Sequence, residues 1–145
     1  MKMSVPRIIV IEDNPADVRL LRYALDETGE KHQLEVLSDG EEALRFVRQC
    51  ATSHGPDPCV IIIDLHLPRY DGTAILSAIR QESSLAHVKV AVLTTIASPD
   101  EELAIRALGV DLYRTKSHEL DELKALAQEI LRICREQPLQ VTAVN

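Results

Sequence analysis

Polar side chains with chemistry to offer stand at the ends of successive apolar runs of the chain. They are Glu12 and Asp13 after the first run, Asp64 and Thr94 after two later ones, and Lys116 soon after the last. Carboxylates that crowd together raise one another's pKa unless a hard dication neutralises them. Mg²⁺ prefers oxygen ligands and keeps waters that a phosphate group can replace. If these residues meet in the fold, they form a Mg²⁺ site with a hydroxyl and an amine beside it.

Each of these residues has an ordinary explanation when it is taken alone. An Asp that closes a strand commonly forms a turn, and Glu12-Asp13 could be an acidic approach to the helix that follows. Thr94 could be a loop hydroxyl and Lys116 an exposed lysine. Their position favours a shared site, because ligands of an open parallel sheet bind outside the carboxyl ends of its strands.

The elements that must position these residues alternate regularly along the chain. Short apolar runs without internal alternation predict strands over 7–11, 34–37, 59–63, 88–93 and 110–113. Helical spacing and capping residues predict helices that begin near Asn14-Pro15, Asp39-Gly40, Thr73, Ser98-Pro99 and Leu120. Alternating strands and helices indicate right-handed βαβ units, and so an α/β fold with a parallel sheet and helices on both faces.

Size and composition fit one folded domain. The chain has 145 residues, of which 46% are hydrophobic and 27% charged, and its net charge of −7 disfavours contact with nucleic acid. Cys50, Cys59 and Cys134 form no CxxC pattern, so we expect reduced thiols in a cytoplasmic protein. The apolar runs are too short to cross a membrane.

Several motifs, taken in order, resemble the CheY-like receiver domain of two-component response regulators. They are Ile11-Glu12-Asp13, Ile63-Asp64-Leu65-His66-Leu67-Pro68, Asp71-Gly72, Leu93-Thr94 and Thr115-Lys116. The resemblance covers residues 5–136 and leaves 137–145 as a C-terminal tail. It implies a doubly wound, flavodoxin-like sheet of five parallel strands in the order 2-1-3-4-5.

The resemblance also implies roles at the site. Asp64 would be the phosphoacceptor, and it would bind Mg²⁺ together with Asp13, with Glu12 acting largely through water and the backbone carbonyl of His66 as a further ligand. Mg²⁺ and the ammonium of Lys116 would stabilise charge on the transferring phosphoryl oxygens.

Four residues would act after phosphorylation in such a domain. Thr94 would hydrogen-bond a phosphoryl oxygen, Tyr113 would turn from exposed to buried, and His66 and Ile96 would tune hydrolysis of the acyl phosphate. The surface formed by the fourth helix, the fifth strand and the fifth helix would then present the signal to a partner. Tyr113 could equally be a half-buried aromatic of its strand.

The chain departs from the family pattern after Lys116. The family usually has a proline there in a cis peptide, whereas Ser117 follows here, and a cis bond to a non-proline costs about 2.5–4 kcal/mol. We therefore expect a trans peptide, with Ser117 as N-cap of the last helix. Glu12 in place of the commoner Asp is a mild change.

Two other functions remain open on the sequence. A haloacid-dehalogenase-type phosphotransferase also uses an Asp nucleophile with Mg²⁺, but on the first strand, whereas Asp64 follows the third. A receiver that is never phosphorylated and serves only as a protein interaction module is the second. Neither alternative is favoured. We therefore expect that the chain is not an enzyme, apart from catalysing its own phosphorylation and dephosphorylation.

The expected partners follow from the same resemblance. The Glu-Asp-Asn-Pro-Ala-Asp start looks like single-domain regulators paired with phytochrome-type histidine kinases. A sensor histidine kinase would supply the phosphoryl group, and a histidine phosphotransfer protein could receive it. A homodimer could form through the face of the fourth helix and the fifth strand and helix, extended by apolar residues of 138–144.

Overall fold

A computed structural model describes residues 5–52, 57–96 and 98–136 of the protein. Five parallel strands form one sheet in the order β2-β1-β3-β6-β7. The strands are β1 Arg7–Ile11, β2 Gln33–Leu37, β3 Val60–Asp64, β6 Lys89–Thr94 and β7 Leu112–Thr115. The predicted fold class and strand order are confirmed.

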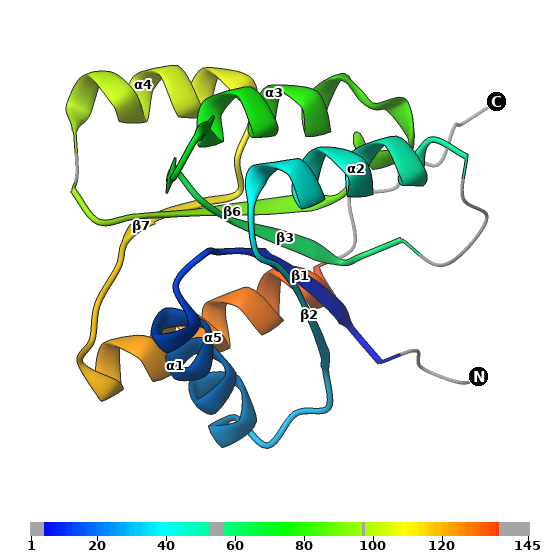
Figure 1. The fold of residues 1–145 in the computed structure, drawn as a ribbon. Coiled ribbons are helices and arrows are strands. Elements are labelled where there is room, and N and C mark those ends of the chain that lie inside the picture. The colour runs from blue at the N-terminus through cyan, green and yellow to red at the C-terminus, as the bar shows by residue number, and fades with distance from the viewer. Residues whose placement is uncertain (1–4, 53–56, 97, 137–145) are drawn as a thin grey trace, which may run out of the picture.

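Helices cover both faces of the sheet. They are α1 Pro15–Glu27, α2 Gly40–Cys50, α3 Gly72–Gln81, α4 Pro99–Leu108 and α5 Leu120–Arg135. Figure 1 shows α1 and α5 on one face and α2, α3 and α4 on the other. The predicted tail at 137–145 and the apolar residues at 138–144 lie outside the described residues.

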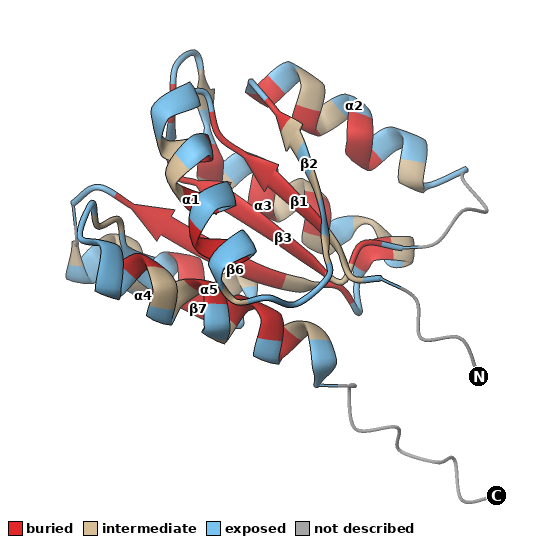
Figure 2. Ribbon diagram, turned by 90° about the horizontal axis from the view of Figure 1, so that it is seen from below, coloured by how far each residue is buried: buried red, intermediate tan, exposed pale blue. Residues whose placement is uncertain are grey.

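The sheet is apolar on both faces because each face has its own helical cover. In β1, Ile9 and Ile11 pack toward α2, α3 and α4, whereas Ile8 and Val10 pack toward α1 and α5. The same alternation runs through β3, whose residues are all buried, as the red central strands of Figure 2 show. Burial on both faces explains the unbroken apolar runs of the sequence.

The predicted helix starts are confirmed by their caps. Asn14 Oδ1 accepts a hydrogen bond from the backbone of Ala16 at 2.9 Å, and the Asp39 and Ser98 side chains cap α2 and α4 in the same way. The cap of α5 is different from the prediction. Glu119, not Ser117, precedes α5, and Ser117 Oγ instead accepts the backbone N–H of Glu119 at 3.1 Å.

Gly72 begins α3 at a point where two segments of backbone meet. A Cβ at this position would lie 2.6 Å from Leu65 Cα and 2.8 Å from the Leu65 carbonyl oxygen. Between them, β4 His66–Leu67 and β5 Tyr70–Asp71 form a small antiparallel hairpin that the sequence analysis did not predict. Gly72 therefore allows α3 to start directly against the segment that follows Asp64.

The last strand begins two residues later than predicted. Asp111 donates its backbone N–H to the Val90 carbonyl, and its Oδ2 accepts the Val90 N–H at 2.9 Å. The side chain thus takes the place of a backbone acceptor, and the regular ladder with β6 starts at Leu112. The shift brings Thr115 to the end of β7, directly before Lys116.

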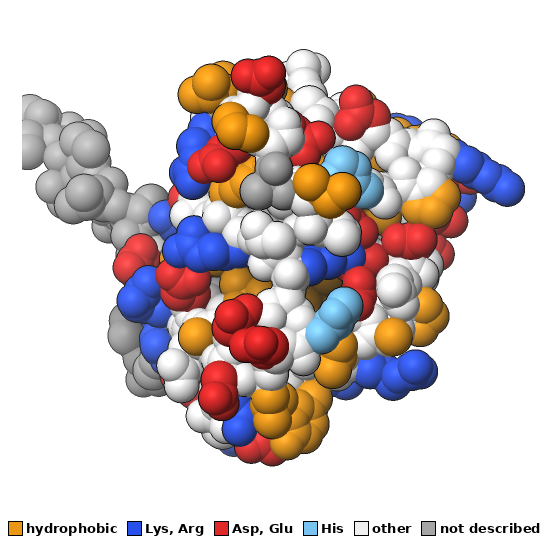
Figure 3. Space-filling view, turned by 90° about the vertical axis from the view of Figure 1, so that its left-hand side faces the viewer, with side chains coloured by type: hydrophobic (Ala, Val, Ile, Leu, Met, Phe, Trp, Pro, Cys, Tyr) orange, Lys and Arg blue, Asp and Glu red, His pale blue; other side chains and the backbone are white. Residues whose placement is uncertain are grey.

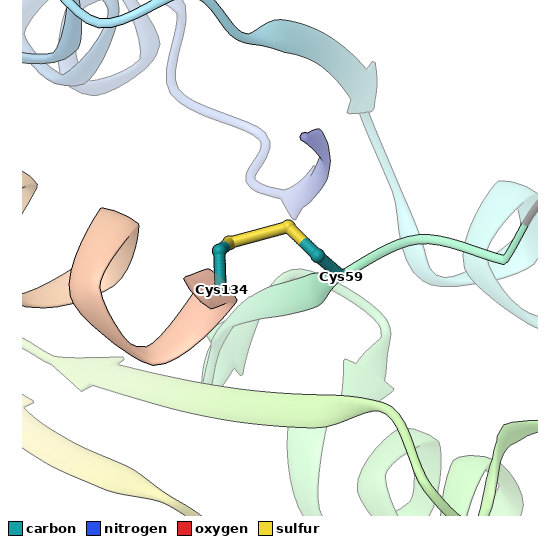
Figure 4. The surroundings of a disulfide bond; sticks show 2 residues. All are labelled: Cys59 and Cys134. Atoms are coloured by element: carbon teal, nitrogen blue, oxygen red, sulfur yellow. A yellow bond between two sulfur atoms is a disulfide. The ribbon is translucent and has the colours of Figure 1, made fainter. Parts of the chain in front are cut away.

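The expectation of three reduced thiols is wrong for two of them. Cys59 and Cys134 form a disulfide, shown in Figure 4, with Cα atoms 5.2 Å apart, and Cys50 is free. Cys59 immediately precedes β3, and Cys134 lies in the last turn of α5. The two residues are far apart in sequence, so no spacing pattern could indicate that the packing of α5 brings them together.

No helix among the described residues is both long enough and apolar enough to span a membrane.

Candidate functional site

Three carboxylates meet at the carboxyl ends of β1 and β3. Ligand oxygens of Glu12, Asp13 and Asp64 all lie within 4.8 Å of one another. Glu12 and Asp64 are buried and Asp13 is exposed. Figure 3 faces this edge of the sheet, where acidic and basic side chains gather around the middle. The oxygen donors and their mutual distances fit one hard divalent cation.

The ammonium of Lys116 lies among carboxylates. Its Nζ is 2.5 Å from Glu12 Oε1, 2.9 Å from Asp17 Oδ2 and 3.0 Å from Asp64 Oδ2. The Lys116 backbone N–H donates to the Thr94 carbonyl at 2.7 Å, which continues the ladder from β7 to β6. The peptide that follows Lys116 is trans, as predicted, and the side chain still reaches Asp64.

Asp17 belongs to this site although the sequence analysis did not single it out. It lies in the first turn of α1, where an acidic residue is expected simply to complement the helix dipole. Its second oxygen, Oδ1, lies 3.4 Å from His118 Nε2. The sequence places the start of this helix at the sheet edge that carries Lys116, but it does not indicate that Asp17 and Lys116 pair across 99 residues.

Two groups of the site, Glu12 and Lys116, have raised pKa values. Burial, with the negative charge of Asp64 nearby, raises the pKa of Glu12 to about 7 despite the opposing effect of Lys116. Burial lowers the pKa of Lys116, but hydrogen bonds to Glu12, Asp17 and Asp64 outweigh it and raise that pKa overall. Lys116 is therefore an ammonium at neutral pH, and Glu12 takes up a proton readily unless a cation occupies the cluster.

Asp17 shows the opposite shift. Burial raises its pKa, but the hydrogen bond and charge of Lys116, and next those of His118, outweigh this and hold the pKa of Asp17 below its ordinary value. Asp17 is therefore a carboxylate at neutral pH, with a formal negative charge directed at Lys116.

Thr94 ends β6 as a fully buried hydroxyl. Its Oγ1 donates to the Ile96 carbonyl at 3.1 Å and makes a second hydrogen bond, also of 3.1 Å, with His66 Nε2. His66 also contacts the end of β3, because its backbone N–H donates to Asp64 Oδ1 at 3.0 Å. The same ring nitrogen lies 3.6 Å from Glu101 Oε1 at the start of α4. Thr94 and His66 thus connect Asp64 to α4.

Tyr113 is buried, whereas Ile96 is exposed. Tyr113 is only 6% exposed, and the Arg106 guanidinium lies 5.8 Å from the centre of its ring. The Ile96 side chain is 71% exposed, and this residue reaches the site only through its backbone carbonyl. Neither side chain belongs to the carboxylate cluster, which Glu12, Asp13 and Asp64 form.

Together the fold and the site define a receiver domain. Residues 8–128 match the family "Response regulator receiver domain", and the chain belongs to that family of two-component signalling proteins. This is a family of signalling domains rather than of enzymes with a separate substrate.

Among individual relatives, the chain is 37% identical over 124 residues to "Response regulator Rcp1" of Synechocystis, which covers 85% of this chain and 84% of that protein. It is also similar to the solved structure of the phosphorylated cyanobacterial phytochrome response regulator RcpA, with 33% identity, a TM-score of 0.77, and coverage of 88% of this chain and 91% of that one. The Mn²⁺-bound form of Rcp1 gives 36% identity and a TM-score of 0.74, covering 86% of this chain and 91% of that one.

Proposed function

We propose that the chain accepts a phosphoryl group from a sensor histidine kinase onto Asp64, with Mg²⁺ as cofactor. The observation that carries the proposal is the cluster itself, in which three carboxylate side chains lie within 4.8 Å and Lys116 Nζ lies 3.0 Å from Asp64 Oδ2. Asp13 and Asp64 would hold the cation directly, with Glu12 largely through water and the backbone carbonyl of His66 as a further ligand. When bound, Mg²⁺ supplies positive charge that binds and polarises the phosphoryl oxygens.

The protein's own groups orient the reacting carboxylate. Asp64 Oδ1 accepts the His66 N–H and Oδ2 accepts from Lys116, so both oxygens have fixed directions. An Asp64 oxygen forms the bond to phosphorus as the bond from phosphorus to the donor imidazole nitrogen breaks. Lys116 then stabilises the charge on the phosphoryl oxygens. Hydrolysis of the acyl phosphate by water, tuned by His66 and Ile96, resets the chain.

The same proposal assigns the signal to the face formed by α4, β7 and α5. Thr94 would exchange the Ile96 carbonyl and His66 for a phosphoryl oxygen, which pulls the segment after β6 toward Asp64, while Tyr113 occupies its buried position. Ile96 and Leu103 expose 71% and 70% of their surface beside this face. A second copy of the chain, joined through this face, is the partner we propose for the phosphorylated form.

The relatives support a phytochrome-type kinase as the donor. RcpA is described as a phytochrome response regulator, and a bacteriophytochrome response regulator of 31% identity and TM-score 0.70 is also similar. A histidine phosphotransfer protein is the second candidate partner. We assign the receiver domain to 5–136, followed by the tail at 137–145, and propose a cytoplasmic location because such kinases present their phosphohistidine there.

Incubation with Mg²⁺ and acetyl phosphate, followed by intact-protein mass spectrometry, tests the proposal. The protein should gain the mass of one phosphoryl group, which alkaline treatment removes, and Asp64→Asn should gain none. No gain in the unaltered chain would indicate an interaction module that is never phosphorylated. An equal gain in Asp64→Asn would exclude Asp64 as acceptor. Sustained release of phosphate from many substrates would instead favour the phosphotransferase alternative.

A further inference from the structure

Lys116 has one carboxylate partner, Asp17, that lies outside the metal cluster. Glu12 and Asp64 belong to the cluster, and the charge that they offer to Lys116 is shared once a divalent cation binds between them. Asp17 lies outside the cluster, and its Oδ2 is 2.9 Å from Lys116 Nζ. Asp17 is therefore the carboxylate whose attraction for the ammonium persists when the cluster holds a cation.

The position of Asp17 is fixed by α1. The helix is capped by Asn14 and begins with Pro15. Val18, next to Asp17, is buried, and Leu21 of the same helix belongs to the core shared with α5 and the sheet. The Asp17 side chain is 18% exposed. Asp17 lines a small cavity with Glu12, Asp64 and Lys116, and the other walls are largely apolar residues of α1, α5 and the strands β1, β3 and β6. In such surroundings an ion pair is stronger than in open solvent.

Lys116 needs such a partner because its other two carboxylate contacts, Glu12 and Asp64, are shared with the cation. It follows β7, which is an edge strand of the sheet, and its side chain has four flexible carbons whose ordering costs about 2 kcal/mol of entropy. Asp17 contacts this segment twice, through Oδ2 at Lys116 and through Oδ1 at His118, 3.4 Å away. The carboxylate thus ties the start of α1 to the loop between β7 and α5.

From these contacts we propose that Asp17 is a positioning residue that keeps the Lys116 ammonium over Asp64 when Mg²⁺ occupies the cluster. The inference rests on the proposed phosphoacceptor function. Asp17 does not touch the phosphoryl group and acts only through Lys116. An acid that merely complements the dipole of α1 would affect the stability of the helix and leave Lys116 in place.

A kinetic cycle on the full chain separates these roles. With saturating Mg²⁺, Asp17→Asn should lower the maximal rate constant of phosphorylation by acetyl phosphate about 10-fold, because the lysine remains present but is poorly aimed. In a Lys116→Met background the same change should alter the rate less than about 2-fold. An equal fold-change in both backgrounds, or no change in the unaltered background, would overturn the proposal. Asp17→Ala repeats the cycle, and circular dichroism verifies that each variant folds.

A matched control lies on the same helix. Asp26 also pairs with a histidine, since its Oδ1 is 3.2 Å from His32 Nε2, but this pair is at the other end of α1. Asp26→Asn should leave the rate constant within about 2-fold of the unaltered value. A loss in Asp26→Asn as large as in Asp17→Asn would mean that the rate follows helix stability rather than Lys116.

A second readout does not depend on phosphorylation. Nuclear magnetic resonance of the Lys116 ε-methylene, in protein saturated with Mg²⁺, reports how well the side chain is ordered. Asp17→Asn should make this group as mobile as an exposed lysine, whereas Asp26→Asn should not. If the unaltered chain accepts no phosphate, the proposed function fails and the ε-methylene still decides the role of Asp17. A Lys116 that stays ordered in Asp17→Asn would overturn it.

Discussion

At the scale of single residues, Glu12 is a buried carboxylate with a raised pKa. Because the pKa of Glu12 is raised from 4.5 to about 7, the folded protein holds a proton that the unfolded chain releases over this range. The free energy of unfolding of the metal-free protein should therefore fall as the pH rises through this window, by up to about 3 kcal/mol. Urea unfolding at pH 5 and pH 8 in the presence of a chelator measures the difference.

Glu12→Gln is the control for this pH dependence, because the amide keeps the shape of the side chain and cannot titrate. The variant should lose the part of the pH dependence that Glu12 causes. Its free energy of unfolding should therefore fall less between pH 5 and pH 8 than that of the unaltered protein. Saturating Mg²⁺ should have a similar effect, because the cation stabilises the ionised carboxylate. Identical slopes in the two chelated proteins would contradict the assignment.

His66 restrains the Thr94 hydroxyl that the proposed switch must release. Removing its imidazole with His66→Ala deletes a hydrogen bond of 3.1 Å to Thr94 Oγ1, and such bonds contribute about 0.5–1.5 kcal/mol. The phosphorylated state, in which Thr94 turns to the phosphoryl group, should be favoured correspondingly, by about 2- to 10-fold in the equilibrium with a partner that binds it. Calorimetric titration of a partner with beryllofluoride-treated protein measures this.

The matched control for His66 is His87, which is also exposed and also pairs with a carboxylate. Its Nε2 lies 2.9 Å from Asp57 Oδ2, away from Thr94. His87→Ala should leave partner affinity unchanged. Weaker partner binding by His66→Ala would mean that the histidine supports the switched state instead of restraining Thr94.

At the scale of elements, the contact between α3 and the segment after β3 depends on one missing side chain. Gly72→Ala would place a Cβ 2.6 Å from Leu65 Cα, and backbone cannot move away as a flexible side chain can. We expect a loss of about 1–3 kcal/mol in the free energy of unfolding, the usual range for overpacking. Because the displaced segment includes Asp64 and His66, the phosphorylation rate should fall as well.

Gly29→Ala provides the comparison for this prediction. Gly29 ends the turn after α1 with φ of +76°, and no atom lies within 4 Å of a Cβ placed there. Its replacement should cost only about 1 kcal/mol of backbone strain and should leave phosphorylation unchanged. Equal effects of the two substitutions on phosphorylation would show that Gly72 does not position the acceptor.

The elements were predictable from the sequence where local chemistry determines them. Unbroken apolar runs and caps such as Asn14 and Ser98 depend on neighbours within a few residues, and those strands and helices are confirmed. The boundaries of β7 were missed because a side chain, Asp111, replaces a backbone acceptor of the ladder. Ser117 was mistaken for a helix cap because a serine hydroxyl can accept a backbone N–H in a turn as well as at a helix start. Here it accepts the N–H of Glu119, in the turn before α5.

At the scale of the whole molecule, what the sequence could not indicate are contacts between distant segments. The proximity of the carboxylates and Lys116 could be predicted, because the carboxyl ends of the parallel strands share one edge of the sheet. The pairing of Asp17 with Lys116 spans 99 residues and depends on the angle at which α1 leaves that edge. The bond between Cys59 and Cys134 depends likewise on how α5 lies across the sheet.

The disulfide gives the whole-molecule prediction, because it ties the start of the central strand β3 to the end of the last helix. Its two cysteines are 75 residues apart, and closing a loop of this size removes enough entropy from the unfolded chain to stabilise the fold by about 4 kcal/mol in the chain-entropy description, with about 2–4 kcal/mol typical in practice. Urea unfolding of the oxidised protein, with and without reductant, should show this difference. Cys134→Ser should unfold like the reduced protein under both conditions, whereas Cys50→Ser should retain the full response because Cys50 is free. A response to reductant that survives in Cys134→Ser would show that a different thiol pair stabilises the chain.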